Sequence, residues 1–337
     1  IHNQRVSRFV KKRYYRCKEC SGCFAEPLYC VDGKNRMTVR LRNHIAEKAK
    51  ITPFSTLEND LKISHTTIRK IFLEEVESLP SLGELETPRI LGIDEICLMA
   101  NNDYKRKQPW AVIANGEERT VMDMLKDRSK PSIIRALQSL QKPNNVEVVT
   151  MDMWSGYRNA VYETLPNAIV VIDKFHIVKM LTEQLDNMRR RYSRLGPAEL
   201  KRNRAIFLMR EDKLTPYARD LRQQWFNEYP KLETACRLTE NFYKIYDSPN
   251  RQEAEERYLD WKKSIPYNDS EFNGYSMITS TIRRCEKEVF NYFDAPETNA
   301  FVEGLNSVIR GIATQGRGYD FDVLRGKVLF TAGRRCA

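Results

Sequence analysis

The pattern of apolar residues changes once along the chain, and this change limits the fold more than any other feature. Between residues 89 and 173, short apolar runs alternate with segments of helical spacing. Strands are predicted over 89–99, 110–114, 120–124, 146–152 and 168–173, with helices over 131–140 and 157–164. The first three strands follow one another closely, which favours antiparallel pairing. The later strands alternate with helices, so the sequence predicts a mixed α/β sheet.

Strand patterns stop after residue 175, and the chain is predicted to be helical as far as about residue 290. This stretch is highly charged and includes a basic block over residues 189–204. It is therefore predicted to be a helical insertion into the α/β unit. The chain has no apolar run of membrane-spanning length and no signal-peptide pattern at its start.

Three carboxylates stand where a phosphoryl-transfer site would need them. Asp94 lies inside an apolar strand, where a charge is costly unless it is paired or metal-bound. Asp152 ends a later strand, and ligand sites gather at strand ends in α/β sheets. Glu303 lies beside the apolar stripe of a predicted helix over residues 299–310. Each residue alone has a simpler explanation, as a turn residue or a first-turn charge. Together they could hold two Mg²⁺ or Mn²⁺ ions about 4 Å apart.

A fourth element, Asp173 and His176, follows the last predicted strand. If that strand lies beside the one ending at Asp152, His176 could contact a scissile phosphate or orient a ligand. The alternative is a helix start, with Asp173 as the N-cap and His176 in the first turn. The sequence favours neither interpretation.

The first 35 residues are basic and rich in cysteine. Cys17 and Cys20 have a spacing that suits one tetrahedral Zn²⁺, and Cys23 and Cys30 could complete the ligand set. His2 is a further candidate ligand. The alternative is a set of free thiols, because this spacing is unusual for a zinc ribbon.

Residues 39–79 are predicted to form three helices, the last two of which resemble a helix-turn-helix. The alternative is a generic three-helix bundle. The chain also has a formal net charge of +11, which favours a polyanionic partner. Candidate DNA contacts lie in the N-terminal arm, the third helix, and a tail after Arg310 that is expected to be a loop. They are Arg13, Arg16, His65, Thr66, Arg69, Lys70, Arg310 and Arg317.

The motifs around these residues resemble those of DDE transposases. They include Gly-Ile-Asp-Glu ending at Glu95, Met-Asp-Met-Trp-Ser-Gly-Tyr ending at Tyr157, and Asp-Lys-Phe-His ending at His176. The fourth is Asn-Ala-Phe-Val-Glu-Gly-Leu-Asn, which ends at Asn306. Their order is most similar to that of the bacterial insertion-sequence transposases of the ISL3 family, and the resemblance covers nearly the whole chain.

The resemblance implies a ribonuclease-H-like core with Asp94, Asp152 and Glu303 as the metal-binding triad and His176 in an Asp-x-x-His signature. It implies an N-terminal zinc segment, of which Cys17 and Cys20 match the second ligand pair. The expected organisation is a Cys-rich segment (1–35), a helix-turn-helix (36–80), the first part of the core (88–175), the helical insertion (176–290) and the last part of the core (291–337).

The function implied is a transposase that binds terminal inverted repeats, hydrolyses a phosphodiester and joins the freed strand to target DNA. Two ends must be brought together, so a homodimer or larger assembly is expected on DNA. The expected location is the bacterial cytoplasm, at the nucleoid. The alternative is a DNA-binding regulator derived from a transposase that no longer cuts DNA.

Overall fold

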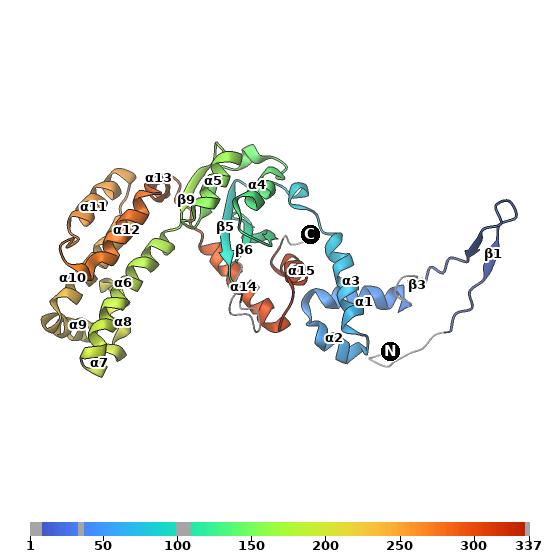
Figure 1. Cartoon of the computed structure of the whole chain (residues 1–337), viewed down its shortest axis with the longest axis horizontal. Helices are drawn as coiled ribbons and strands as arrows, with labels where there is room; N and C mark the ends of the chain where they lie inside the picture. Colours follow the sequence, from blue (N-terminus) through green and yellow to red (C-terminus); the bar gives the residue numbers. More distant parts are fainter. Residues whose placement is uncertain (1–8, 33–36, 99–108, 334–337) are drawn as a thin grey trace.

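A computed structural model describes residues 9–32, 37–98 and 109–333 of the 337-residue chain. His2 therefore lies outside the described residues. Figure 1 shows three parts arranged along the long axis of the molecule. A mixed sheet occupies the middle, a body of helices lies on one side, and a three-helix unit with a projecting N-terminal hairpin lies on the other.

The central sheet has five strands in the order β7-β6-β5-β8-β9. The strands are β5 (Ile90–Ile96), β6 (Trp110–Asn115), β7 (Thr120–Leu125), β8 (Val148–Met151) and β9 (Ile169–Ile172). β5, β6 and β7 pair antiparallel, whereas β5, β8 and β9 are parallel. The mixed α/β sheet predicted from the sequence is confirmed.

Side-chain alternation along β5 decides which helices cover each face of the sheet. Leu91 and Ile93 belong to the apolar core that also includes residues of α4 (Lys130–Gln138) and α5 (Ser155–Thr164). Ile96 points to the opposite face and packs in a second core with α14 and α15. Because successive strand residues point to opposite faces, Asp94 shares the face of Ile96 and is directed towards α14.

The insertion predicted from the helical pattern consists of helices between β9 and α14, and it extends away from the sheet along α6 (Figure 1). Its helices are α6 (Lys174–Leu195), α7 (Ala198–Arg202), α8 (Arg204–Leu208), α9 (Pro216–Glu228), α10 (Pro230–Tyr246), α11 (Arg251–Lys263), α12 (Asn273–Arg283) and α13 (Glu286–Phe290). Buried aromatic side chains hold them together. Trp261, for example, packs on Phe242 and donates a hydrogen bond from Nε1 to the Leu238 carbonyl oxygen at 2.8 Å.

The tail after Arg310 is helical, so the prediction of a loop there was wrong. Helix α14 (Ala300–Gly316) continues past Arg310, and α15 (Phe321–Ala332) follows after a short turn. Ile312 and Ala313 pack against the second core, which maintains the helix through a stretch whose glycines suggested a loop. Arg317 ends α14 in a left-handed conformation with φ of 49°.

The three-helix unit contains α1 (Val39–Ile51), α2 (Phe54–Leu61) and α3 (His65–Glu77). Lys62 ends α2 with φ of 55°, and the Ser64 side chain caps α3 by accepting a hydrogen bond from the Thr67 amide. This unit packs on α15. Gly326 permits the close approach, because a Cβ there would lie 2.3 Å from a methyl carbon of Val76.

The remaining short elements lie before α1 or between longer ones. The strands are β1 (Tyr14–Arg16), β2 (Cys23–Ala25), β3 (Val31–Asp32) and β4 (Met37–Thr38). Single 3-10 turns occur at Leu82–Glu84, Pro143–Asn145, Glu211–Lys213, Ser270–Phe272 and Asn291–Phe293. None of the helices in the described ranges has the length and apolar character needed to cross a membrane.

Candidate active site

Strand register places three aspartates in a row at the carboxyl edge of the parallel strands. Ile93 pairs with Met151, and Met151 pairs with Ile172. The residues that follow them are Asp94, Asp152 and Asp173. Neighbouring strands lie about 4.8 Å apart, so this register brings three acidic residues from distant parts of the chain to one edge. A hydrogen bond from the Asp173 amide to the Met151 carbonyl oxygen, 2.9 Å, extends the pairing to the end of the row.

Helix α14 brings Glu303 to this edge because it lies directly on β5. Gly92 allows the contact, since a Cβ at this position would lie 2.4 Å from a Val302 methyl carbon and 2.6 Å from the Phe301 ring. The fully buried Asn299 side chain joins the helix start to the sheet. Its Oδ1 accepts a hydrogen bond from Thr150 Oγ1 at 2.9 Å. Glu303 lies in the first turn of α14, one helical turn beyond this attachment.

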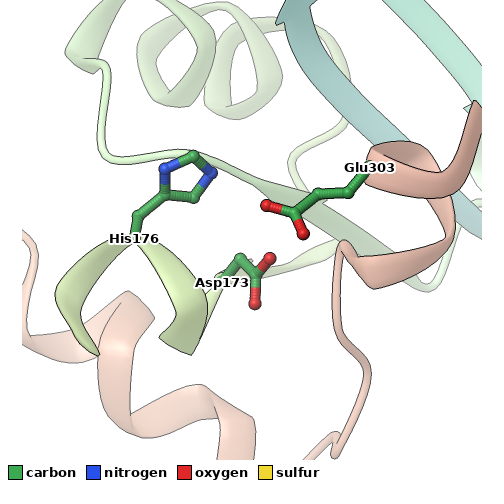
Figure 2. A group of neighbouring side chains, drawn as sticks. All are labelled: Asp173, His176 and Glu303. Atoms are coloured by element: carbon green, nitrogen blue, oxygen red, sulfur yellow. The ribbon is translucent and has the colours of Figure 1, made fainter. Parts of the chain in front are cut away.

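The side chains of Glu303, Asp173 and His176 lie close together at the edge, as Figure 2 shows. Each offers a ligand atom, and these atoms lie within 4.8 Å of one another. Asp173 is the N-cap of α6, and its Oδ1 accepts a hydrogen bond from the Phe175 amide. Its Oδ2 and His176 Nε2 are buried, and neither has a partner among the described residues. Asp173 thus caps a helix and still has one carboxylate oxygen available to a ligand.

Asp94, Asp152 and Glu303 do not form a group as close as this one among the described residues. They nevertheless influence one another. The pKa of Asp94 is raised to about 6, chiefly by burial; Asp152 and Glu303 also act to raise it, whereas the hydrogen bond from the Glu95 amide and the charge of His176 act to lower it. Burial also raises the pKa values of Asp152 and Glu303, and again His176 acts in the opposite direction. The imidazole is therefore the group that all three carboxylates share.

The chemistry of this edge suits a divalent cation. Asp94 is only 5 % exposed, and no Lys or Arg of the described residues forms an ion pair with it. Carboxylate charges that are buried without a countercharge raise one another's pKa, and a cation relieves that repulsion. The unpartnered Asp173 Oδ2 and His176 Nε2 add donor atoms to the carboxylate oxygens of Glu303. Oxygen donors with one imidazole are compatible with Mg²⁺ or Mn²⁺.

The sequence analysis did not identify Asn306 as part of the site. Its side chain is 2 % exposed, and its Nδ2 donates hydrogen bonds to Asp94 Oδ2 at 2.9 Å and to the Glu95 carbonyl oxygen at 3.4 Å. Asn306 lies three residues after Glu303 and Asn299 lies four residues before it, so all three share one face of α14. That spacing in the sequence was the available signal.

A second missed group lies on the Asp152 side. Arg128 forms an ion pair with Glu95, and its guanidinium lies over the Trp154 ring at 5.0 Å. The same cation lowers the pKa of Asp152 against the effect of burial. Trp154 also contacts Tyr157 edge-on at 4.7 Å and packs against the main core. The Arg128 side chain therefore connects Glu95, the residue after Asp94, with Trp154, which follows Asp152 at the end of β8.

The residues expected to contact DNA are spread over the N-terminal hairpin region, α3 and α14, and Arg310 on α14 is close enough to Glu303 to lower its pKa. His65, Thr66 and Lys70 are exposed on α3. Arg69 forms an ion pair with Asp320 at 2.6 Å, the residue that caps α15. The other four lie outside α3, Arg13 and Arg16 in the N-terminal hairpin region and Arg310 and Arg317 along and after α14; all four are exposed.

The cysteines expected to bind zinc lie on the hairpin and just after it. Cys17 and Cys20 are in the β1–β2 turn, Cys23 is in β2, and Cys30 precedes β3. All four are free thiols. No three of their sulfur atoms lie within 4.8 Å of one another in the part of the chain that the structure describes. The zinc site stays a prediction.

One comparison with known proteins identifies a family for this chain. The family model for ISL3-type DDE transposases, described as a transposase, matches residues 91–328, which is more than half of the chain. The match begins in β5, beside Asp94, and extends through Glu303 into α15. No curated protein matches the chain. The extent of the family match shows that this chain belongs to the ISL3 family of DDE transposases.

Proposed function

We propose that the chain binds the ends of a mobile DNA element, hydrolyses a phosphodiester there and transfers the freed strand to target DNA. One observation carries the proposal. Asp94, Asp152 and Glu303, from three distant segments, come to the carboxyl edge of the parallel strands near enough to His176 for its charge to act on the pKa of each. Membership of a transposase family and the basic net charge support it.

The proposed architecture is a ribonuclease-H-like core formed by residues 88–175 and 291–337 and interrupted by the insertion over residues 176–290. Three facts support it: the mixed five-stranded sheet, the helices between β9 and α14, and the return of the chain to β5 at Glu303. Residues 36–80 are the proposed helix-turn-helix, and residues 1–35 the proposed Cys-rich segment.

Asp94, Asp152 and Glu303 are the proposed metal-binding triad, with Asp173 and His176 beside them. Two divalent ions held by such carboxylates would activate water or a 3′ hydroxyl and stabilise the leaving oxygen of the phosphodiester. The chain's own groups fix the site. Asn306 orients Asp94 by a hydrogen bond, and Asn299 anchors the helix that carries Glu303. His176 Nε2, buried and without a partner among the described residues, would face the reacting phosphate.

DNA recognition is assigned to α3 and the hairpin. His65, Thr66 and Lys70 are exposed at the start of α3, where a recognition helix contacts base edges. Arg13 and Arg16 lie on either side of exposed Tyr14 and Tyr15, and this mixture of cations and rings suits a nucleic-acid backbone and its bases. We place this activity on bacterial DNA, with a dimer or larger assembly formed on two ends.

The test is a cleavage assay on labelled element-end DNA with Mn²⁺. The parent protein, Asp152→Ala and Glu303→Gln are compared for DNA binding and for strand cleavage. We expect all three to bind equally and only the parent to cleave. Binding without cleavage by any of them, including the parent, would replace this proposal with the DNA-binding regulator.

A further inference from the structure

One face of α6 leads directly out of the candidate active site. His176, Lys179, Glu183, Asp186 and Arg190 follow one another at intervals of three and four residues, so their side chains share one stripe of the helix. Lys179 is exposed and close enough to Glu303 to lower its pKa against burial, which ties the stripe to the catalytic edge. The stripe spans about 21 Å from His176 to Arg190 at 1.5 Å per residue.

A cluster of arginines around one buried carboxylate lies at the far end of this stripe. Asp186 accepts from Arg189 at 2.7 Å, from Arg190 at 2.9 Å and from Arg204 at 3.2 Å. Burial alone would raise the pKa of Asp186, but the bonds from Arg189 and Arg204 lower it below its ordinary value. One carboxylate is thus surrounded by three cations.

The three arginines do different things. The Arg189 side chain is 3 % exposed, and its Nη1 donates to the Leu200 carbonyl oxygen at 3.1 Å, which joins α6 to α7. Arg189 therefore balances the charge of Asp186 and stabilises the packing of α7 on α6. Arg190 and Arg204 are 59 % and 57 % exposed and use only Nε towards Asp186. Their remaining guanidinium N–H groups have no hydrogen-bond partner among the described residues and are available to an acceptor outside the chain.

These two arginines line an open cavity of about 450 Å³ between α6 and α8. Lys179 and Asn187 lie on the same wall, and Glu183 is the single exposed acid there. Its lining residues are polar or charged except for Leu208, and none of them is aromatic, so the cavity offers charges and hydrogen bonds but no aromatic ring for base stacking. Such a lining suits the sugar-phosphate backbone of DNA, because Arg binds phosphate oxygens well.

We propose that Arg190 and Arg204 hold a backbone phosphate of the DNA strand that leaves the active site along α6. At about 3.4 Å per base pair along the duplex axis, the 21 Å stripe corresponds to about six base pairs from the scissile phosphate. The site binds phosphate without regard to sequence. This inference rests on the proposed cleavage of DNA at the carboxylate edge, and it adds a path for the substrate.

The experiment measures binding of the full chain to a mixed-sequence DNA duplex by fluorescence anisotropy, in EDTA so that no cleavage occurs. The double variant Arg190→Gln/Arg204→Gln is compared with Arg237→Gln/Arg257→Gln. The control arginines belong to the same insertion and each pair with a glutamate one turn earlier, so the control removes the same charge. The logarithm of the affinity falls linearly with the logarithm of the salt concentration, and each phosphate that the protein neutralises adds about 0.9 to the magnitude of the slope.

Because the two arginines hold one phosphate, we expect the magnitude of the slope of log affinity against log salt to fall by about 1 in the first variant and to stay unchanged in the control. An equal slope in both variants would overturn the proposal.

A second measurement needs no variant. Hydroxyphenylglyoxal modifies exposed arginines, and bound DNA should protect Arg190 and Arg204 in the parent while Arg237 reacts as before. Unchanged reactivity of all three would also overturn it.

The two proposals can fail separately. A parent protein that cleaves DNA but shows no protection of Arg190 and Arg204 retains its proposed function and loses this phosphate site. A parent that shows protection but cleaves nothing retains the phosphate site and loses the enzymatic function.

Discussion

At the scale of single residues, the geometry of the site depends on side chains that are not themselves acidic. Asp94 is held at both carboxylate oxygens: Oδ1 accepts from the Glu95 amide and Oδ2 from Asn306 Nδ2. Asn306 Oδ1 is buried and has no partner among the described residues. The amide therefore acts only as a donor here, and Asp94 has a fixed orientation without an ion pair to any of the described residues.

Truncation of Asn306 should lower activity without unfolding the chain. In Asn306→Ala, Asp94 keeps its charge but loses the donor that orients it. Removing such a supporting contact usually costs 10- to 100-fold in metal affinity or activity. The Mn²⁺ concentration needed for half-maximal cleavage should rise by a factor in that range. The exposed neighbour Ser307→Ala serves as the control, and a metal dependence equal to that of the control would contradict the role given to Asn306.

At the scale of elements, α14 and β5 form the joint on which the site depends. The helix can lie close to the strand only where β5 lacks a Cβ, at Gly92. In Gly92→Ala, the added methyl group meets Val302 and Phe301, so α14 must move outward. We expect a loss of about 1–3 kcal/mol in the free energy of unfolding from overpacking, together with loss of cleavage.

Gly311→Ala is the matched control for that prediction. It adds the same methyl group to α14 at an exposed position, where a Cβ would meet nothing within 4 Å. Its free energy of unfolding should be equal to or above that of the parent, because alanine favours helix over glycine. Thermal unfolding of both variants checks the pair. A Gly92→Ala protein as stable and active as Gly311→Ala would refute the close approach.

The junction between α15 and the three-helix unit contains a buried ammonium group. Lys327 is 2 % exposed, and its Nζ donates to the Thr52 carbonyl oxygen at 2.7 Å. Three rings surround it, those of Phe54 at 4.7 Å, Phe72 at 5.4 Å and Tyr319 at 5.4 Å. The rings and the carbonyl partly replace the water that the charge has lost. This residue links the proposed DNA-binding unit to the proposed catalytic part of the chain.

Stability should therefore rise with pH in the alkaline range. Burial lowers the pKa of Lys327 to about 8 from an ordinary value of 10.5. Between these values the unfolded chain binds more protons than the folded chain, so the free energy of unfolding increases with pH. The gain should reach at most about 3 kcal/mol. Urea unfolding of the parent and of Lys327→Met would measure it, and parallel pH curves for the two proteins would contradict the assignment.

The reach of the sequence is visible in the same elements. Short apolar runs between segments of helical spacing predicted the mixed sheet, because a strand that is buried on both faces must be apolar along its length. The change to helical spacing after residue 175 predicted the helices of the insertion. The helix beyond Arg310 was missed because its glycines resemble a loop, while its stability comes from contacts of Ile312 and Ala313 with other elements. Such tertiary support leaves no local pattern.

The site was predictable only in part for a similar reason. An acid inside an apolar strand is conspicuous, so Asp94 and Asp152 could be selected from the sequence. The row that adds Asp173 to them depends on the strand order β5-β8-β9 and on register, which no single segment encodes. The bond from Asn306 to Asp94 depends on how close α14 lies to β5, and therefore on Gly92.

At the scale of the whole molecule, the chain combines a net charge of +11 with proposed DNA contacts on the three-helix unit and on the insertion. The three-helix unit and the insertion lie on opposite sides of the sheet (Figure 1), and the carboxylate edge lies between them. An element end held by α3 on one side and by the α6 cavity on the other would pass this edge. Under the two proposals, a DNA strand would be positioned at two points and cut between them.

The central claim is that Asp94, Asp152 and Glu303 hold cations at one point in space. Replacement of Mg²⁺ by Fe²⁺, with ascorbate and peroxide, generates hydroxyl radicals that cut the polypeptide close to the bound metal. The account predicts fragments that end near residues 94, 152, 173–176 and 303, all suppressed by excess Mg²⁺. Cuts confined to other segments, or cuts near residue 303 without any near residues 94 and 152, would contradict it.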